Sequence, residues 1–123
     1  MTHIHRLPRR RLFGILALPI AAALAACDPA PQPKQFVGLW KSSRLGSTLR
    51  MTAEGEWEIR DFEDRVLQYG VWQLRDRMLV WTVRLDGGRL HHDPNPVLAV
   101  GPDRFELRER DGSITRFVRL GTP

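Results

Sequence analysis

The sequence predicts an all-β domain of about eight short antiparallel strands in an up-and-down meander, closed into a small barrel or folded as a strongly curved sheet. From Phe36 onward, apolar runs of five to nine residues alternate with clusters of turn residues. Two of the expected hairpins each have a register that separates apolar from charged side chains. No stretch combines a sustained helical period with a capping signal.

The expected strands follow one another with mostly short connections. They span residues 38–42, 48–52, 56–62, 66–74, 78–85, 97–100, 104–109 and 113–120. The longest connection is "DGGRLHHDPNP", residues 86–96. We expect it to be a loop because its two glycines and two prolines favour turns, and because Asp93 and Asn95 can accept hydrogen bonds from turn amides.

The hairpin "LRMTAEGEWEI" favours a three-residue loop, residues 53–55, with Gly55 in the left-handed conformation of a bulge. A two-residue loop would place Met51 opposite Glu58, so that each face of the hairpin would carry both apolar and charged side chains. The three-residue loop pairs Met51 with Trp57, Leu49 with Ile59, and Arg50 with Glu58. This register puts the apolar side chains on one face, and a slip of one residue would move every side chain to the other face. The three-residue loop is therefore predicted.

The hairpin "FELRERDGSITRF" gives the same result with a loop at residues 110–112. The predicted pairs are Phe105 with Phe117, Leu107 with Thr115, and Glu106 with Arg116. For the hairpin around Glu63-Asp64 the sequence leaves the register open.

Three tripeptides, GLW (38–40), GEW (55–57) and GVW (70–72), place glycine two residues before tryptophan on the same strand face. Glycine there leaves a notch for a neighbouring ring. Seven large side chains are candidates either for the core or for lining a ligand site: Trp40, Met51, Trp57, Trp72, Trp81, Phe105 and Phe117. We expect the four tryptophans mainly to pack the core, and the sequence leaves open whether they close the interior or leave a cavity.

Gly38-Leu39-Trp40, Gly70-Val71-Trp72 and the final "DRFELRERDGSITRFVRL" together resemble the small lipocalin-like lipoproteins of Gram-negative bacteria. The resemblance covers most of residues 36–120. It implies a short barrel domain that follows a lipoprotein signal peptide.

The first 26 residues have the three parts of a secretory signal peptide. A basic start carries four arginines, an uncharged run spans residues 12–26, and Ala25 and Ala26 precede Cys27. The uncharged run contains Gly14 and Pro19 and is shorter than the ~20 apolar residues of a transmembrane helix. A permanent membrane helix is therefore the weaker interpretation.

Leu24-Ala25-Ala26-Cys27 resembles the lipobox of bacterial lipoproteins, whose cysteine receives a diacylglyceryl group on sulfur and, after cleavage, an acyl group on its amino terminus. The resemblance implies that Cys27 carries fatty chains such as palmitate. Two or more such chains hold a protein stably on a membrane. The alternative is ordinary cleavage that leaves a free exported thiol, since the chain has one cysteine and cannot form an internal disulfide.

Two details of the leader bear on its route and destination. Arg10-Arg11-Leu12-Phe13 resembles part of a twin-arginine export signal, although a generic basic start explains the same residues and is preferred. Asp28 resembles the residue that keeps enterobacterial lipoproteins in the inner membrane. We predict a periplasm-facing, lipid-anchored protein of the bacterial cell envelope, with inner and outer membrane both open and Asp28 favouring the inner.

The net charge of +5 belongs mostly to the leader. Without its four arginines, 15 lysines and arginines face 14 acidic residues, which leaves no clustered positive charge for a nucleic-acid backbone. After Cys27, the proline-rich residues 28–35 are expected to form an extended tether. The barrel domain then occupies residues 36–120, and 121–123 form a short tail.

The segment 86–96 contains three plausible metal ligands, His91, His92 and Asp93. Adjacent residues of an extended chain point in opposite directions, and the domain has no cysteine to complete a tetrahedral set. We expect no metal and no cofactor.

Glu56 and Glu58 lie two residues apart, on a strand face shared with Arg50 and Arg60. This arrangement predicts ion pairs and not an acid–base couple. The sequence has no phosphate-binding loop and no nucleophile elbow, so we predict that the protein is not an enzyme.

The favoured function is a non-catalytic binding or structural module on a lipid anchor, whose partner is another envelope protein or a small apolar ligand. The alternative is a metal-dependent hydrolase centred on His91, His92 and Asp93.

Overall fold

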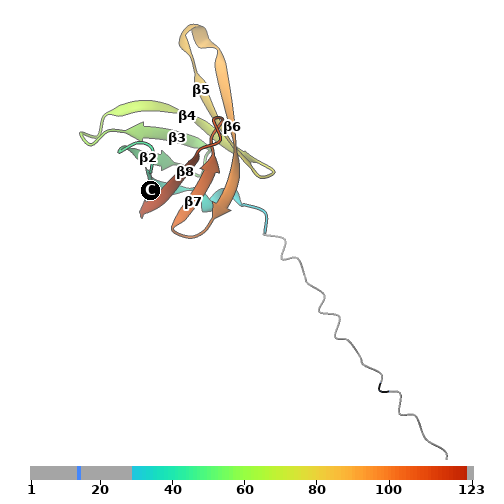
Figure 1. Cartoon of the computed structure of the whole chain (residues 1–123). Coiled ribbons are helices and arrows are strands. Elements are labelled where there is room, and N and C mark those ends of the chain that lie inside the picture. Colours follow the sequence, from blue (N-terminus) through green and yellow to red (C-terminus); the bar gives the residue numbers. More distant parts are fainter. Residues whose placement is uncertain (1–13, 15–28, 122–123) are drawn as a thin grey trace, which may run out of the picture.

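Eight antiparallel strands, each paired with its neighbours along the chain, close into a barrel in the computed structural model, which describes Gly14 and residues 29–121 (Figure 1). The first strand also pairs with the last. The strands are β1 (Gly38–Ser42), β2 (Thr48–Met51), β3 (Glu56–Arg60), β4 (Val66–Arg75), β5 (Met78–Arg84), β6 (Leu90–Val100), β7 (Arg104–Arg108) and β8 (Ile114–Gly121). The predicted all-β meander is confirmed as a small barrel of lipocalin-like architecture.

Helical structure in the described residues is limited to two 3-10 turns, η1 (Pro33–Gln35) and η2 (Asp86–Gly88). The predicted signal peptide apart from Gly14, the predicted lipidation site Cys27 and the neighbouring Asp28 lie outside the described residues, as do residues 122–123 of the tail.

Both predicted hairpin registers are confirmed. In the β2–β3 hairpin Met51 pairs with Trp57, Leu49 with Ile59 and Arg50 with Glu58. In the β7–β8 hairpin Phe105 pairs with Phe117, Leu107 with Thr115 and Glu106 with Arg116. The loop glycines, Gly55 and Gly112, have φ angles of 87° and 86°, in the left-handed region that the three-residue loops require.

The β3–β4 hairpin, whose register the sequence left open, uses the same kind of loop. The Asp61 amide donates to the Arg65 carbonyl at 3.0 Å, and the Asp64 amide donates to the Asp61 carbonyl at 3.0 Å. Asp64 occupies the left-handed position with φ 63°. Aspartate tolerates this conformation better than most residues, so it replaces the glycine of the other two loops.

The predicted loop at residues 86–96 is wrong over most of its length, because Leu90–Val100 form the longest strand, β6. The Val97 amide donates to the Arg77 carbonyl beside β5 at 2.8 Å, so by alternation the nitrogens of Pro94 and Pro96 point away from β5. Residues 90–96 pair with β5, and the pairing of β6 with β7 begins only at Val97. The prolines therefore sit on a free edge, where no amide donor is needed.

Part of the predicted extended tether is folded. Pro33–Gln35 form η1, whose start is stabilised by a hydrogen bond from the Gln32 amide to the Gln35 side chain at 2.7 Å, with proline at the first helical position. Pro31 and Phe36 on either side of η1 are buried. The chain thus packs against the barrel before β1 begins.

Arg119 on β8 fastens η1 to the barrel. Its guanidinium donates to the carbonyls of Pro102 at 2.7 Å, Val37 at 2.8 Å and Gln35 at 3.2 Å. It also lies 4.2 Å from the centre of the Trp40 ring, a cation–π contact. A Cβ atom at Gly38 would collide with this guanidinium, which explains the first glycine of the GLW motif.

The barrel half beside η1 is filled with side chains. Phe36, Trp40 and Phe105 are fully buried, and the Phe105 ring meets the other two edge to face at centroid distances of 5.0 Å and 4.7 Å. Met51, Leu79 and Leu107 complete this packed half with no exposed surface. It holds the main core of the protein.

The notch predicted at glycines of the GxW motifs is present at Gly70, which pairs with Trp57 across the β3–β4 ladder. An added Cβ atom would lie 2.8 Å from the Trp57 Nε1 atom and would collide with the Thr82 carbonyl. The Trp57 indole passes this point and donates to the Val71 carbonyl at 3.0 Å. Gly70 therefore allows the ring to reach between two strands.

We predict that Gly70→Ala destabilises the protein by about 2 kcal/mol or more, because the methyl group overpacks a site bounded by backbone and a buried indole. Gly46→Ala is the matched control, since a Cβ at Gly46 would have no atom within 4 Å. The measurement is the free energy of unfolding by chemical denaturation. Equal effects of the two substitutions would contradict the packing assigned to Gly70.

Candidate functional site

The half of the barrel away from η1 is not filled and contains a cavity of about 340 Å³ that opens at the barrel mouth. The mouth is the end where the β1–β2, β3–β4, β5–β6 and β7–β8 loops lie. Interior strand positions near these loops form the walls. The volume is at the lower end of the range for small-molecule sites, about 300–1,000 Å³.

The inner surface of the cavity is aromatic and aliphatic. Trp57, Trp81 and Phe117 line it, with the Trp81 ring centre 5.7 Å from Trp57 and 6.4 Å from Phe117. Leu49 and Ile59 are adjacent aliphatic walls. Such a surface favours an apolar group over a charged one, because an ion entering it would lose hydration without a buried partner.

The rim of the cavity is polar. Glu109 is 17% exposed at its side chain, accepts a hydrogen bond from the Thr115 hydroxyl at 2.6 Å and lies 3.3 Å from the Arg44 guanidinium. Arg44 also lies 3.8 Å from Asp111. The hydrogen bond from the Ser113 hydroxyl, with its amide and Arg44 beside it, holds the pKa of Asp111 below its usual value. The rim is thus a small ion-pair network around an apolar interior.

The structure separates the seven predicted large side chains into two groups. Trp57, Trp81 and Phe117 line the mouth cavity, and the first and last of them are also buried members of the core cluster. The other four belong to the buried core and do not line the mouth: Trp40, Met51, Trp72 and Phe105.

Several lining residues were not predicted, including Arg44, Gln68, Glu109 and Thr115. Glu109 and Thr115 were detectable in principle, because they continue the inward alternation of Phe105, Leu107 and Phe117. Arg44 lies in a loop, where strand alternation gives no direction.

The three candidate metal ligands are divided between the two faces of β6. His91 and Asp93 line the mouth cavity, whereas the Nδ1 atom of His92 lies 2.8 Å from the Thr82 hydroxyl. Within residues 29–121, no group of three or more histidine, cysteine or acidic side chains is arranged to hold a metal ion.

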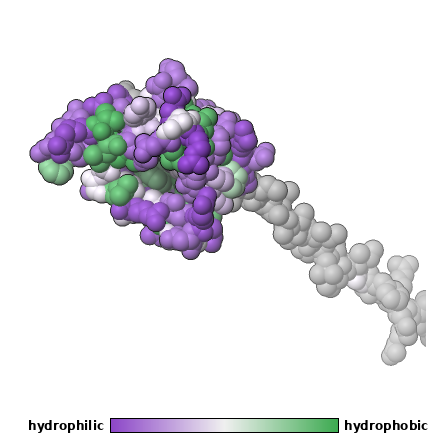
Figure 2. Space-filling model, turned by 90° about the horizontal axis from the view of Figure 1, so that it is seen from above, coloured by the Kyte–Doolittle hydropathy of each residue, from purple (hydrophilic) through white to green (hydrophobic). Residues whose placement is uncertain are grey.

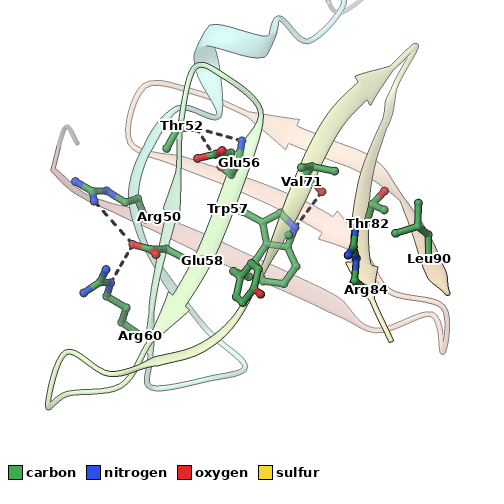
Figure 3. Close-up of a pocket in the computed structure, with 12 residues that line it drawn as sticks. Arg50, Thr52, Glu56, Trp57, Glu58, Arg60, Val71, Thr82, Arg84 and Leu90 are labelled. Carbon is green, nitrogen blue, oxygen red and sulfur yellow. Dashed lines mark hydrogen bonds and ion pairs between the residues drawn. The ribbon is translucent and has the colours of Figure 1, made fainter. Parts of the chain in front are cut away.

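A second hollow, a groove of about 660 Å³, lies on the outer wall across β3, β4 and β5 (Figure 3). At one side Glu58 lies 2.9 Å from Arg60 and 3.8 Å from Arg50, the ion pairs expected from the sequence. The Glu58 hydrogen bond raises the pKa of Arg60 above its usual value. Trp57 lines both this groove and the mouth cavity, so its indole separates the two.

Comparison with known proteins adds no family: no family model, curated protein or solved structure matches the chain. In the part of the chain that the structure describes, no helix has the length and apolar character needed to span a bilayer.

Proposed function

We propose that this chain is a lipid-anchored protein of the bacterial cell envelope that binds a small apolar ligand in the barrel mouth without catalysing a reaction. The observation that carries the ligand proposal is the cavity itself. Three aromatic side chains line an unfilled space in a barrel whose other half is packed. A purely structural role would not require this space to stay open.

The anchor part of the proposal is supported by Leu24-Ala25-Ala26-Cys27 and the basic leader that precedes it. Lipid on Cys27 would place the membrane next to the barrel end covered by η1. The mouth lies at the opposite end, facing the periplasm. A ligand would enter from the aqueous side of the envelope, with its apolar part against Trp57 and Trp81 and any polar end at the Arg44–Glu109 rim.

We predict that the purified protein binds N-phenyl-1-naphthylamine, a neutral fluorescent probe, and that Ile59→Gln weakens binding about ten-fold, or about 1.4 kcal/mol. Ile59 lines the cavity, and its replacement brings an amide into contact with the apolar probe. Ile114→Gln is the matched control, because Ile114 is 46% exposed on β8 and does not line the cavity. Fluorescence titration measures both; absence of binding, or equal weakening by the two variants, would remove the ligand proposal.

We predict that the mature chain begins at Cys27, carries acyl groups and remains in the membrane fraction after a high-salt wash, because two or more acyl chains anchor a protein stably. Cys27→Ser abolishes the added mass of the acyl groups. Ala30→Ser, which also introduces a serine but three residues downstream, leaves that mass intact. Intact-mass spectrometry of the washed membrane fraction is the measurement. A wild-type chain in the aqueous fraction with a thiol that reacts with maleimide would refute the anchor.

A further inference from the structure

The barrel wall has a gap between β4 and β5. Pairing between these strands begins at Val71 with Thr82 and runs toward the β4–β5 turn. The first part of β4, Val66 to Gly70, pairs with β3 but has no partner on its β5 side. Figure 1 shows the consequence, since the β3–β4 and β5–β6 hairpins diverge and point in different directions.

The alternation of the ladder identifies the backbone groups that face the gap. The Trp72 amide donates to the Gly55 carbonyl at 2.8 Å, which directs Trp72, Gly70 and Gln68 toward β3. Tyr69, between Gln68 and Gly70, therefore directs its amide and carbonyl groups toward β5, where no strand pairs with them, and the register shift at Leu67 ends this regular alternation. An unpaired backbone donor and acceptor on a sheet edge can pair with an extended segment of another chain.

The protein protects its other free edge but not this one. On β6, the stretch from residue 90 to residue 96 has no partner on its β7 side, and Pro94 and Pro96 remove two of the four amide donors there. Residues 66–70, "VLQYG", contain neither proline nor a charged side chain. Prolines and charges are common means of blocking strand addition, and both are absent here. The register shift at Leu67 leaves residues 68–70 as the regular part of the β4 edge that is open to strand addition.

The groove beside this edge has the character of a peptide site. Tyr69, Val71 and Leu90 line the groove and are respectively 73%, 52% and 56% exposed. Val71 and Leu90 are labelled in Figure 3, and Figure 2 shows apolar groups among polar ones on one face of the barrel. Arg84 also lines the groove and has no hydrogen-bond or ion-pair partner among the described residues. An acyl chain would leave the backbone groups and Arg84 unsatisfied, whereas an extended peptide with an acidic residue would satisfy both.

We propose that the gap between β4 and β5 is a strand-addition site that takes an extended segment of a partner protein, with apolar side chains on alternate residues and a carboxylate near Arg84. The segment hydrogen-bonds to the amide and carbonyl of Tyr69 and rests against the side chains of Tyr69 and Leu90. The site is separate from the mouth cavity, because the Trp57 indole lies between them.

The probe is a synthetic octapeptide of alternating valine and threonine with one central aspartate. We expect it to bind the purified protein, with chemical-shift changes and slowed hydrogen exchange at the Tyr69 amide. The same peptide with N-methyl groups on the amides of one edge is the matched probe, and we expect its affinity to fall at least ten-fold because it cannot form the ladder.

Variants of the protein test the same backbone hydrogen bonds by changing β4 in place of the peptide. Tyr69→Pro removes both the ring and the amide that faces the gap, and we expect at least ten-fold weaker peptide binding. Tyr69→Ala removes the ring but retains the amide, and we expect a smaller loss of about three-fold, so the difference between the two variants reports the amide. Circular dichroism verifies that Tyr69→Pro is folded, and the N-methylated peptide provides the test if it is not. Ile59→Gln should leave peptide binding unchanged, which separates this site from the ligand cavity.

Four results would overturn the proposal. The first two are equal binding of the N-methylated and unmodified peptides, and protection of the Tyr69 amide from exchange in the free protein. The other two are dimerisation through this edge with no peptide binding, and binding of phosphatidylglycerol vesicles at this edge in place of the peptide.

Discussion

The contact of the Arg119 guanidinium with Trp40 and with three backbone carbonyls determines how this barrel closes. It joins four parts of the chain that are distant in sequence: the η1 turn, the start of β1, the β6–β7 loop and β8. Each carbonyl accepts a hydrogen bond from a charged donor, a stronger interaction than that between neutral groups. Gly38 makes the arrangement possible, since any side chain there would occupy the position of the guanidinium.

This closure explains why the barrel has two unlike halves. At the Arg119 end the interior contains Phe36, which comes from outside the strands, in addition to the inward side chains of β1 and β7. At the other end no segment of residues 29–121 folds back over the mouth, and the interior side chains leave the cavity unfilled. The interior of an eight-stranded barrel can either be filled by side chains or hold one small ligand. In this protein the half beside η1 is filled, and the half at the mouth contains the cavity.

Much of the fold could be predicted because its local signals agree. A glycine at the third loop position and strict alternation on both sides specified the β2–β3 and β7–β8 registers to the residue. The first part of β6 was missed because prolines are informative only when the edge they occupy is known. Whether Pro94 faces a neighbouring strand or solvent depends on where β7 joins the sheet, which is a property of the whole barrel.

The candidate site was only partly predictable for a related reason. The sequence identified the large inward side chains but could not separate Trp40, which is packed, from Trp81, which borders the cavity. That distinction depends on which end is plugged by η1, and η1 lay in a segment expected to be extended. The gap between β4 and β5 likewise results from how far the strands stay paired, which alternation within one strand does not record.

The free energy of unfolding of Arg119→Met, compared with Arg116→Met, tests the closure most directly. Methionine keeps much of the aliphatic volume but cannot donate to the carbonyls of Gln35, Val37 and Pro102. We expect Arg119→Met to lose about 3 kcal/mol or more, and Arg116→Met, which removes one exposed ion pair with Glu106, to lose under about 1 kcal/mol. Similar small losses in both variants would contradict the role given to Arg119.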